Sequence, residues 1–267
     1  MKNTAHLSPR RYELLRTPHM LARLTFYPAG GVLSAHAHNT DQYSILMLGG
    51  FAEATRKGEE DLCGIRAGFK SAGLVHQNRF GPDGALILAI DRLPIEMEET
   101  CWRWRSAHGH SAMRQLVWHL LTVDVRGVNA PEAEIQDILD ELTALLFYTP
   151  DAKANGAHRV ASWLRRIREE IDDAPRDASL KKLAHEAGVH HVHLSRSFAK
   201  VYGQPLSLYR RRAMAMRAAS ALAAWGRTPV QAAGEAGFAD QSHMTRVMQS
   251  EIGLTPSRLR RMFAAAS

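Results

Sequence analysis

Residues 237–256 read GFADQSHMTRVMQSEIGLTP, and this stretch determines the fold of the C-terminal part of the chain. Gly237 favours a left-handed turn after a short helix, and Gly253 favours the end of a second helix that starts at Asp240. The residues expected to face inward are Ala232, Ala233, Ala236, Phe238, Met244, Val247 and Met248. A short helix, a tight turn and a second helix with a polar outer face are typical of a helix-turn-helix unit.

Residues 179–205 repeat this plan. Ser179 is the predicted N-cap of a short helix that ends at Gly188, and a second helix follows and ends near Gly203. Between the units, residues 206–224 are predicted to form one helix of about 28 Å, at 1.5 Å per residue. A connector of that length is expected to set two recognition helices about one DNA turn, roughly 34 Å, apart.

Short polar and Arg side chains on the outer face of each second helix are the expected base contacts. They are Val192, Ser195 and Arg196 in the first unit and Ser242, His243 and Arg246 in the second. Arg210, Arg211 and Arg212 on the connector are expected to bind phosphates or to lie on the solvated surface, and not to read bases. Two alternatives stay open: the arginines in the recognition helices form phosphate contacts or local salt bridges, or the bundle has no role in DNA binding.

Both units resemble the AraC/XylS signature. The first does so through residues Leu183-Ala184, 194–198 (LSRSF), Gly203 and 209–212 (YRRR), and the second through Gly237-Phe238, 240–243 (DQSH), Thr245-Arg246, 253–257 (GLTPS) and Arg260. The resemblance covers about residues 159–264 and departs at Ala232 and Met248, two expected core positions. It implies a sequence-specific transcription regulator that binds double-stranded DNA and works with RNA polymerase.

The charge distribution fits this division. Residues 151–267 hold 19 Lys and Arg against 10 Asp and Glu, whereas residues 1–150 hold 15 against 17. The basic excess therefore belongs to the C-terminal part, as expected of a domain that faces a phosphate backbone.

The N-terminal part has a different pattern. Short apolar or alternating runs separated by glycines, between about Leu21 and Leu93, predict a sandwich or small barrel. Helical spacing follows from about Ser111 to Phe147, and its apolar stripes are expected to pack on the barrel or on a second subunit, which would make a homodimer. The predicted division is a barrel at 1–110, a helical hairpin at 111–150, a linker at 151–158 and the double helix-turn-helix at 159–267.

Residues 30–49 resemble the first cupin motif through Gly30, His36, His38, Gln42 and Gly49, with Gln42 in place of Glu. Residues 71–76 (SAGLVH) resemble the second motif, with Ser71 in place of Pro. By this analogy His36, His38, Gln42 and His76 converge inside the barrel, a donor set that suits a divalent metal ion. An organic effector or a purely structural role stays open. Asn78 or Arg79 is a candidate contact for an anionic ligand, and Trp102 and Trp104 are expected to pack the barrel against the helices.

The predicted fold is therefore α+β with two domains, a cupin-like sensor barrel and an all-α DNA-binding domain. The predicted function is effector-responsive transcription regulation; the alternative is a metal-dependent cupin dioxygenase or isomerase with a DNA-binding tail. The chain has two cysteines and no run of roughly 18–20 apolar residues, so a cytoplasmic protein with no membrane span or disulfide framework is expected.

Overall fold

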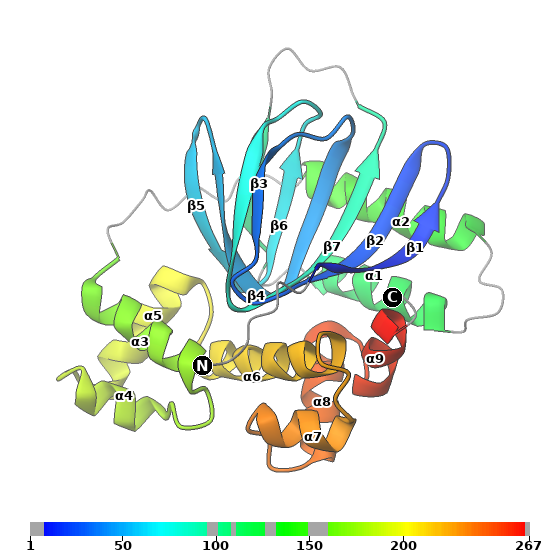
Figure 1. Ribbon diagram of the computed structural model, residues 1–267. Helices are drawn as coiled ribbons and strands as arrows, with labels where there is room; N and C mark the ends of the chain where they lie inside the picture. The colour runs from blue at the N-terminus through cyan, green and yellow to red at the C-terminus, as the bar shows by residue number, and fades with distance from the viewer. Residues whose placement is uncertain (1–7, 95–100, 108–110, 126–131, 149–159, 265–267) are drawn as a thin grey trace.

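The computed structural model describes residues 8–94, 101–107, 111–125, 132–148 and 160–264. One antiparallel sheet forms the N-terminal part, and helices form the rest (Figure 1). The strands are β1 (Arg10–Arg16), β2 (Met20–Tyr27), β3 (Val32–His36), β4 (Asp41–Thr55), β5 (Gly58–Cys63), β6 (Arg66–Lys70), β7 (His76–Arg92) and β8 (Trp102–Ser106). The predicted two-part architecture is confirmed, although the β-pattern extends further than predicted, to β1 and β8.

Two long strands fold the sheet over on itself. Residues 41–49 of β4 pair with residues 85–92 of β7, and residues 51–55 of β4 pair with residues 76–80 of β7. Gly49 and Gly84 lie at the bend with φ values of +77° and +84°, and a Cβ on Gly49 would lie 2.1 Å from the carbonyl oxygen of Gly84. Only glycine fits so close a backbone approach. The two glycines therefore allow β4 and β7 to bend, so that each strand contributes to both halves of the folded sheet.

The interior of the folded sheet has an apolar layer and a polar layer. The apolar layer consists of Leu46, Phe51, Leu62, Phe80, Ala85, Ile87 and Trp104. Buried polar side chains form the other layer and include Gln42, Glu53, Lys70, His76, Asn78 and Asp91. Because buried polar groups are stable only when they have hydrogen-bond partners, the polar layer is the candidate location of a binding site.

Helices α1 (Ser111–Val125) and α2 (Glu132–Tyr148) form the predicted hairpin. Their apolar stripes, with Val117, Leu120, Leu139 and Leu142, are buried in the chain's own core together with strand residues such as Leu24 and Leu88. The stripes therefore pack on the sheet, which is one of the two arrangements expected from the sequence.

The C-terminal helices are α3 (Ser162–Asp173), α4 (Leu180–Glu186), α5 (His191–Tyr202), α6 (Leu206–Ala223), α7 (Pro229–Glu235), α8 (Gln241–Ile252) and α9 (Pro256–Ala264). The predicted local signals are present. The Ser179 side chain accepts a hydrogen bond from the backbone N–H of Lys182, and Gly203 and Gly253 end α5 and α8 in the left-handed conformation. Ala232 and Met248, the two departures from the AraC/XylS pattern, are fully buried and do not disrupt the core.

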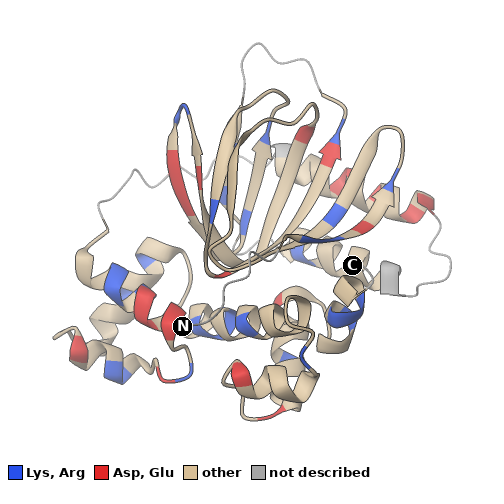
Figure 2. Ribbon diagram, in the orientation of Figure 1, with Lys and Arg blue, Asp and Glu red and all other residues tan. Residues whose placement is uncertain are grey.

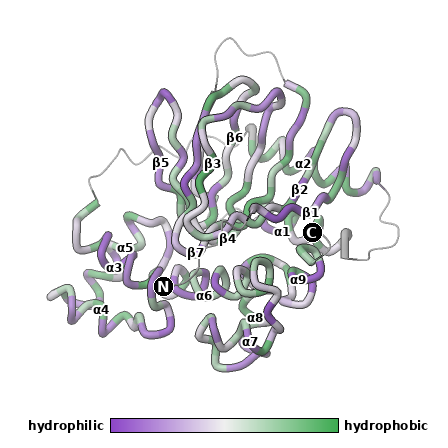
Figure 3. Tube along the Cα trace, in the orientation of Figure 1, coloured by the Kyte–Doolittle hydropathy of each residue, from purple (hydrophilic) through white to green (hydrophobic). Residues whose placement is uncertain are grey.

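Helix α6 runs beneath the sheet and joins the two helix-turn-helix units (Figure 1). Hydrophobic and hydrophilic segments alternate along the strands and helices, as expected when each element buries one face (Figure 3). One hydrophobic core includes Leu48 and Leu88 of the sheet, Leu120 of α1, and Ala215 and Leu222 of α6. Sheet, hairpin and connector helix are thus packed against one another. The predicted linker, residues 151–158, lies outside the described residues.

Candidate DNA interface and effector site

The outer faces of α5 and α8 are open to solvent. Arg196, Ser242 and Arg246 are exposed, Ser195 and His243 are half-buried, and Val192 is 40% exposed, unusually high for a large apolar side chain. Leu194 and Phe198 on α5, like Met244 and Met248 on α8, are fully buried and hold the helices on their supports. The structure therefore presents both predicted recognition faces without covering either.

The three connector arginines have different surroundings. Arg211 is exposed, and Arg210 is half-buried and donates to the carbonyl oxygen of Ala178 at 3.4 Å. Arg212 is only 4% exposed; its guanidinium donates to Glu251 at 3.2 Å and to the carbonyl oxygen of Met47 in β4. The prediction that Arg212 binds phosphate is therefore wrong for this arrangement, because its charge faces the sheet.

Lys and Arg occur along α6 and on the helices around it, and Asp and Glu are frequent on α2 (Figure 2). This distribution agrees with the charge division expected from the sequence. A positive C-terminal domain attracts DNA through its phosphates without reading the sequence.

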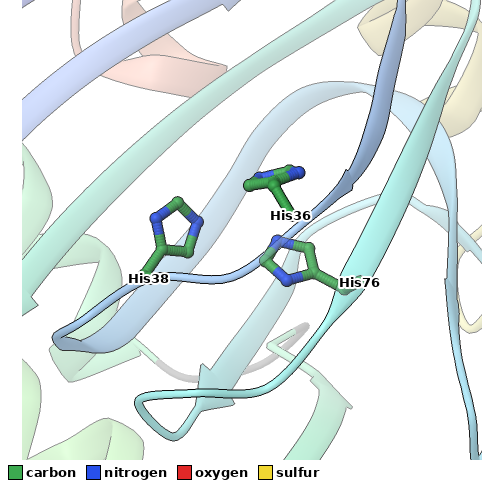
Figure 4. Close-up of side chains that lie close together, drawn as sticks. All are labelled: His36, His38 and His76. Carbon is green, nitrogen blue, oxygen red and sulfur yellow. The ribbon is translucent and has the colours of Figure 1, made fainter.

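Three histidines come together at one end of the folded sheet. His36 ends β3, His38 follows it, and His76 begins β7, where it pairs with His36. One nitrogen from each ring lies within 4.8 Å of the others, and the ring centroids are 4.4 to 5.2 Å apart. The three rings face one another (Figure 4). The structure thus brings together the three histidines singled out by the sequence.

Backbone carbonyls hold two of these rings in place. Nδ1 of His36 lies 2.7 Å from the carbonyl oxygen of Ser34, and Nδ1 of His76 lies 3.2 Å from that of Leu74. A carbonyl only accepts hydrogen bonds, so each Nδ1 carries the proton and each Nε2 keeps its lone pair. Metal-binding histidines generally donate their other ring N–H to a carbonyl or carboxylate in this way.

The surroundings of His38 and His76 disfavour their charged forms. Burial, together with the charge of Lys70, lowers the pKa of His76 to about 4. Burial and Lys70 likewise lower the pKa of His38. A ligating imidazole must be unprotonated, so these two rings are ready to bind a cation at neutral pH.

The amide nitrogen of Gln42 is already engaged. Its Nε2 donates to Oδ1 of Asp91 at 2.9 Å, and Arg23 pairs with the other oxygen of Asp91 at 2.7 Å. Within the described part of the chain, no carboxylate joins the three-histidine set. The donor set that the structure brings together is therefore three imidazoles, which suits zinc, iron or nickel and leaves at least one coordination position open.

A buried carboxylate was missed by the sequence interpretation. Glu53 is completely buried and accepts hydrogen bonds from Lys70, Asn78, Trp102 and Trp104. Asn78 is thus committed to Glu53, and Arg79 is exposed and pairs with Glu59, so the suggestion that either contacts an anion gains no support. The prediction that Trp102 and Trp104 pack the sheet against the helices is wrong, because both indoles donate inward to Glu53.

A cleft of about 1040 Å³ separates the sheet from α3, α5 and α6. Its walls are bridged by ion pairs, of which Arg168 with Asp61 at 2.5 Å and Arg217 with Asp83 at 3.5 Å join the two parts of the chain. Burial raises the pKa of Asp83 to about 6. No pattern in the sequence indicated this cleft, because its walls come from segments far apart in the chain.

Residues 183–262 match the sequence family described as Helix-turn-helix domain. No curated protein sequence matches the chain. With two helix-turn-helix units and this match, the protein is a DNA-binding transcription regulator. The helix-turn-helix domain favours this function over the alternative of a cupin enzyme.

Several solved structures are similar to parts of the chain. The C-terminal domain of AraT, a response regulator from Geobacillus stearothermophilus, has 23% identity and a TM-score of 0.37, and the match covers 39% of this chain and 88% of that one. ToxT from Vibrio cholerae O395 has 10% identity and a TM-score of 0.39, covering 92% and 99%. KdgF from Halomonas sp. has 21% identity and a TM-score of 0.29, covering 33% and 80%. At such low TM-scores these structures inform neither the ligand nor the activity of this chain.

None of the helices within the described ranges has the length and apolar character that crossing a bilayer requires.

Proposed function

We propose that the protein is a one-component regulator whose two recognition helices enter successive major grooves and whose DNA binding responds to an effector held by the N-terminal domain. Base contacts are assigned to Val192, Ser195 and Arg196 on α5 and to Ser242, His243 and Arg246 on α8. Arg210 and Arg211 are assigned to phosphates. The observation that supports these roles is the exposure of both outer faces on one rigid connector, α6.

The effector that the geometry supports best is a divalent metal ion at His36, His38 and His76. The observation that carries this proposal is the approach of three ring nitrogens to within 4.8 Å of one another, with two of the rings oriented by backbone carbonyls. The ion would supply positive charge and open coordination positions at the mouth of the folded sheet.

The same connector helix offers a route from this site to the DNA. Helix α6 holds the spacing of the recognition helices and also packs on β4 and β7, the two strands that carry most of the polar layer. An effector changes DNA affinity only to the extent that it binds one arrangement of sheet and helices better than another. A shift of β7 on ion binding would reach α6 directly.

RNA polymerase is the expected protein partner, and the cytoplasm is the expected compartment. A homodimer is a weaker proposal, because the apolar stripes of α1 and α2 that suggested it are buried within the chain's own core. A dimer would have to use another surface. Sedimentation at micromolar concentration separates a monomer from a dimer.

The test is metal content followed by DNA binding. Full-length protein purified without chelator should hold close to one divalent ion per chain, and the His36→Ala/His76→Ala variant should hold none. His193→Ala, a histidine exposed on α5, is the matched control for metal content. Chelator should alter the affinity of the wild type for its operator and leave the double variant unchanged. Equal metal content in wild type and double variant, or an operator affinity indifferent to the ion, would refute the metal effector and leave the DNA-binding function standing.

A further inference from the structure

Lys70 is a buried cation beside the three-histidine site. It is 6% exposed, and its Nζ donates to Oε1 of Glu53 at 2.7 Å. The same oxygen accepts from Asn78 at 3.0 Å, and Asn78 is the next inward-facing residue after His76 on β7. Residues two apart on a strand lie about 6.6 Å apart, so the ammonium lies within a few hydrogen-bond lengths of the rings.

The ammonium of Lys70 has donors to spare. It carries three N–H groups, of which Glu53 takes one, and the ring of Trp104 lies 5.8 Å away. Across the described ranges, no second acceptor lies within hydrogen-bond distance of Nζ. A buried donor without an acceptor is unfavourable, so an acceptor from outside the chain would stabilise this arrangement.

The carboxylates around the site are already engaged. Glu53 has four donors, and Asp91 is held by Gln42 and Arg23. Asp41, also buried, accepts from the backbone N–H of Ala72. An ion bound by three neutral imidazoles therefore keeps its double positive charge, with no carboxylate of the described chain in its donor set. An anion from solution would compensate the charge of the bound ion and fill an open coordination position.

We propose that the three-histidine site binds its ion together with a small carboxylate, one oxygen coordinating the ion and the other accepting from Lys70. The inference rests on the metal site proposed above and names a second ligand of that site. A carboxylate suits both partners because its two oxygens accept hydrogen bonds and are ordinary ligands of divalent metals. The regulator would then respond to an organic acid in the presence of its metal.

The test uses full-length protein loaded with Co²⁺, whose visible absorption reports the coordination of the ion, and acetate as the probe. Acetate should change the Co²⁺ spectrum and tighten Co²⁺ binding by about tenfold at saturation. Acetamide, which has a similar shape and no charge, should do neither in the wild type. An equal effect of acetamide, or no spectral change with acetate, overturns the proposal.

Variants assign the effect to Lys70. Lys70→Met/Glu53→Gln removes the buried pair together, so that no unpaired charge is left, and keeps all three histidines. It should bind Co²⁺ and lose the acetate effect; Lys57→Met, in the turn after β4, should keep it. An acetate effect retained in the double variant overturns the role of Lys70. If the wild type binds no Co²⁺, the proposal of a metal effector is wrong as well. If Co²⁺ binds and alters DNA affinity but acetate has no effect on its binding, only the proposal of a carboxylate ligand is refuted.

Discussion

The indole of Trp118 on α1 lies directly against Gly253, the residue that ends the second recognition helix. A Cβ on Gly253 would lie 2.6 Å from Cδ1 of Trp118. Helix α1 is itself packed on the sheet, so this contact joins the N-terminal domain to the end of α8. Glycine is thus favoured at position 253 for two reasons: the helix ends there with φ of +72°, and Trp118 leaves no room for a Cβ.

Gly253→Ala is therefore expected to destabilise the protein more than a left-handed conformation alone explains. The positive φ costs about 1–2 kcal/mol for alanine, and the overlap with Trp118 should add roughly 1–3 kcal/mol. Gly188→Ala is the matched control, because Gly188 has φ of +64° and nothing within 4 Å of an added Cβ. Urea unfolding of the two variants measures the difference, and equal losses would show that the Trp118 contact carries no strain.

The contact between Trp118 and Gly253 should also make the stability losses of Trp118→Ala and Gly253→Ala non-additive. In a Trp118→Ala background the overlap is absent, so Gly253→Ala should cost only the part due to its φ. Operator binding by Trp118→Ala should respond less to chelator than that of the wild type, since one contact between the domains is gone. An additive pair of stability losses would contradict the coupling.

The helix-turn-helix units could be predicted from sequence because their signals are local. Ser179 and Gly253 lie at helix ends, where a cap or a positive φ is needed whatever the rest of the chain does. His36 and His76 were found through a motif resemblance and the period of a strand. Glu53 and Lys70 were missed, because 17 residues separate them and only the folding of β4 against β6 and β8 brings the pair under the two tryptophans.

The surroundings of Arg211 and Arg212 also depend on distant parts of the chain, and the two neighbours provide a paired prediction. Arg212→Met should destabilise the protein by about 3 kcal/mol, because Glu251 loses its buried partner and the carbonyl of Met47 loses a donor. Arg211 is exposed, with Nε 3.8 Å from Glu251, so Arg211→Met should change stability by less than about 0.5 kcal/mol.

The two variants should have the opposite order of effect on DNA affinity, with the larger loss in Arg211→Met. If Arg211 contacts a phosphate, Arg211→Met lowers the slope of log affinity against log salt by about one and weakens all sequences alike. A loss of stability in Arg212→Met as small as that in Arg211→Met, together with a lower salt slope, would show that Arg212 contacts a phosphate and that its charge does not face the sheet.

The raised pKa of Asp83 predicts that the stability of the protein depends on pH. Burial raises the pKa of Asp83 to about 6, above its usual value near 3.9, although Arg217 on α6 opposes the shift. The folded protein then binds more protons than the unfolded chain between these values, so this group's contribution to stability rises as pH falls from above 6 towards 4. Asp83→Asn should remove that rise.

The quantity to measure is the difference in unfolding free energy between wild type and Asp83→Asn at pH 7 and pH 5, in chelator. His38 and His76 have lowered pKa values and act in the opposite direction, but they do so in both proteins and cancel. Asp137→Asn, an exposed position on α2, is the control. A difference that stays constant over this pH range would show that Asp83 is not buried in solution.

Arg196 and Arg246 occupy equivalent outer positions on α5 and α8, and both are exposed. If each reads a guanine with two hydrogen bonds, replacement by Ala should cost about 1–3 kcal/mol on the operator and relax selectivity at one base pair each. Because α6 fixes the distance between the helices, the two relaxed positions should lie roughly one DNA turn apart. Arg16→Ala, on the sheet surface and paired with Glu13, controls for loss of charge. Selection of binding sites from random DNA measures all three variants. A uniform loss across all sequences would assign the arginines to phosphates, and relaxed positions next to each other would rule out binding in successive grooves.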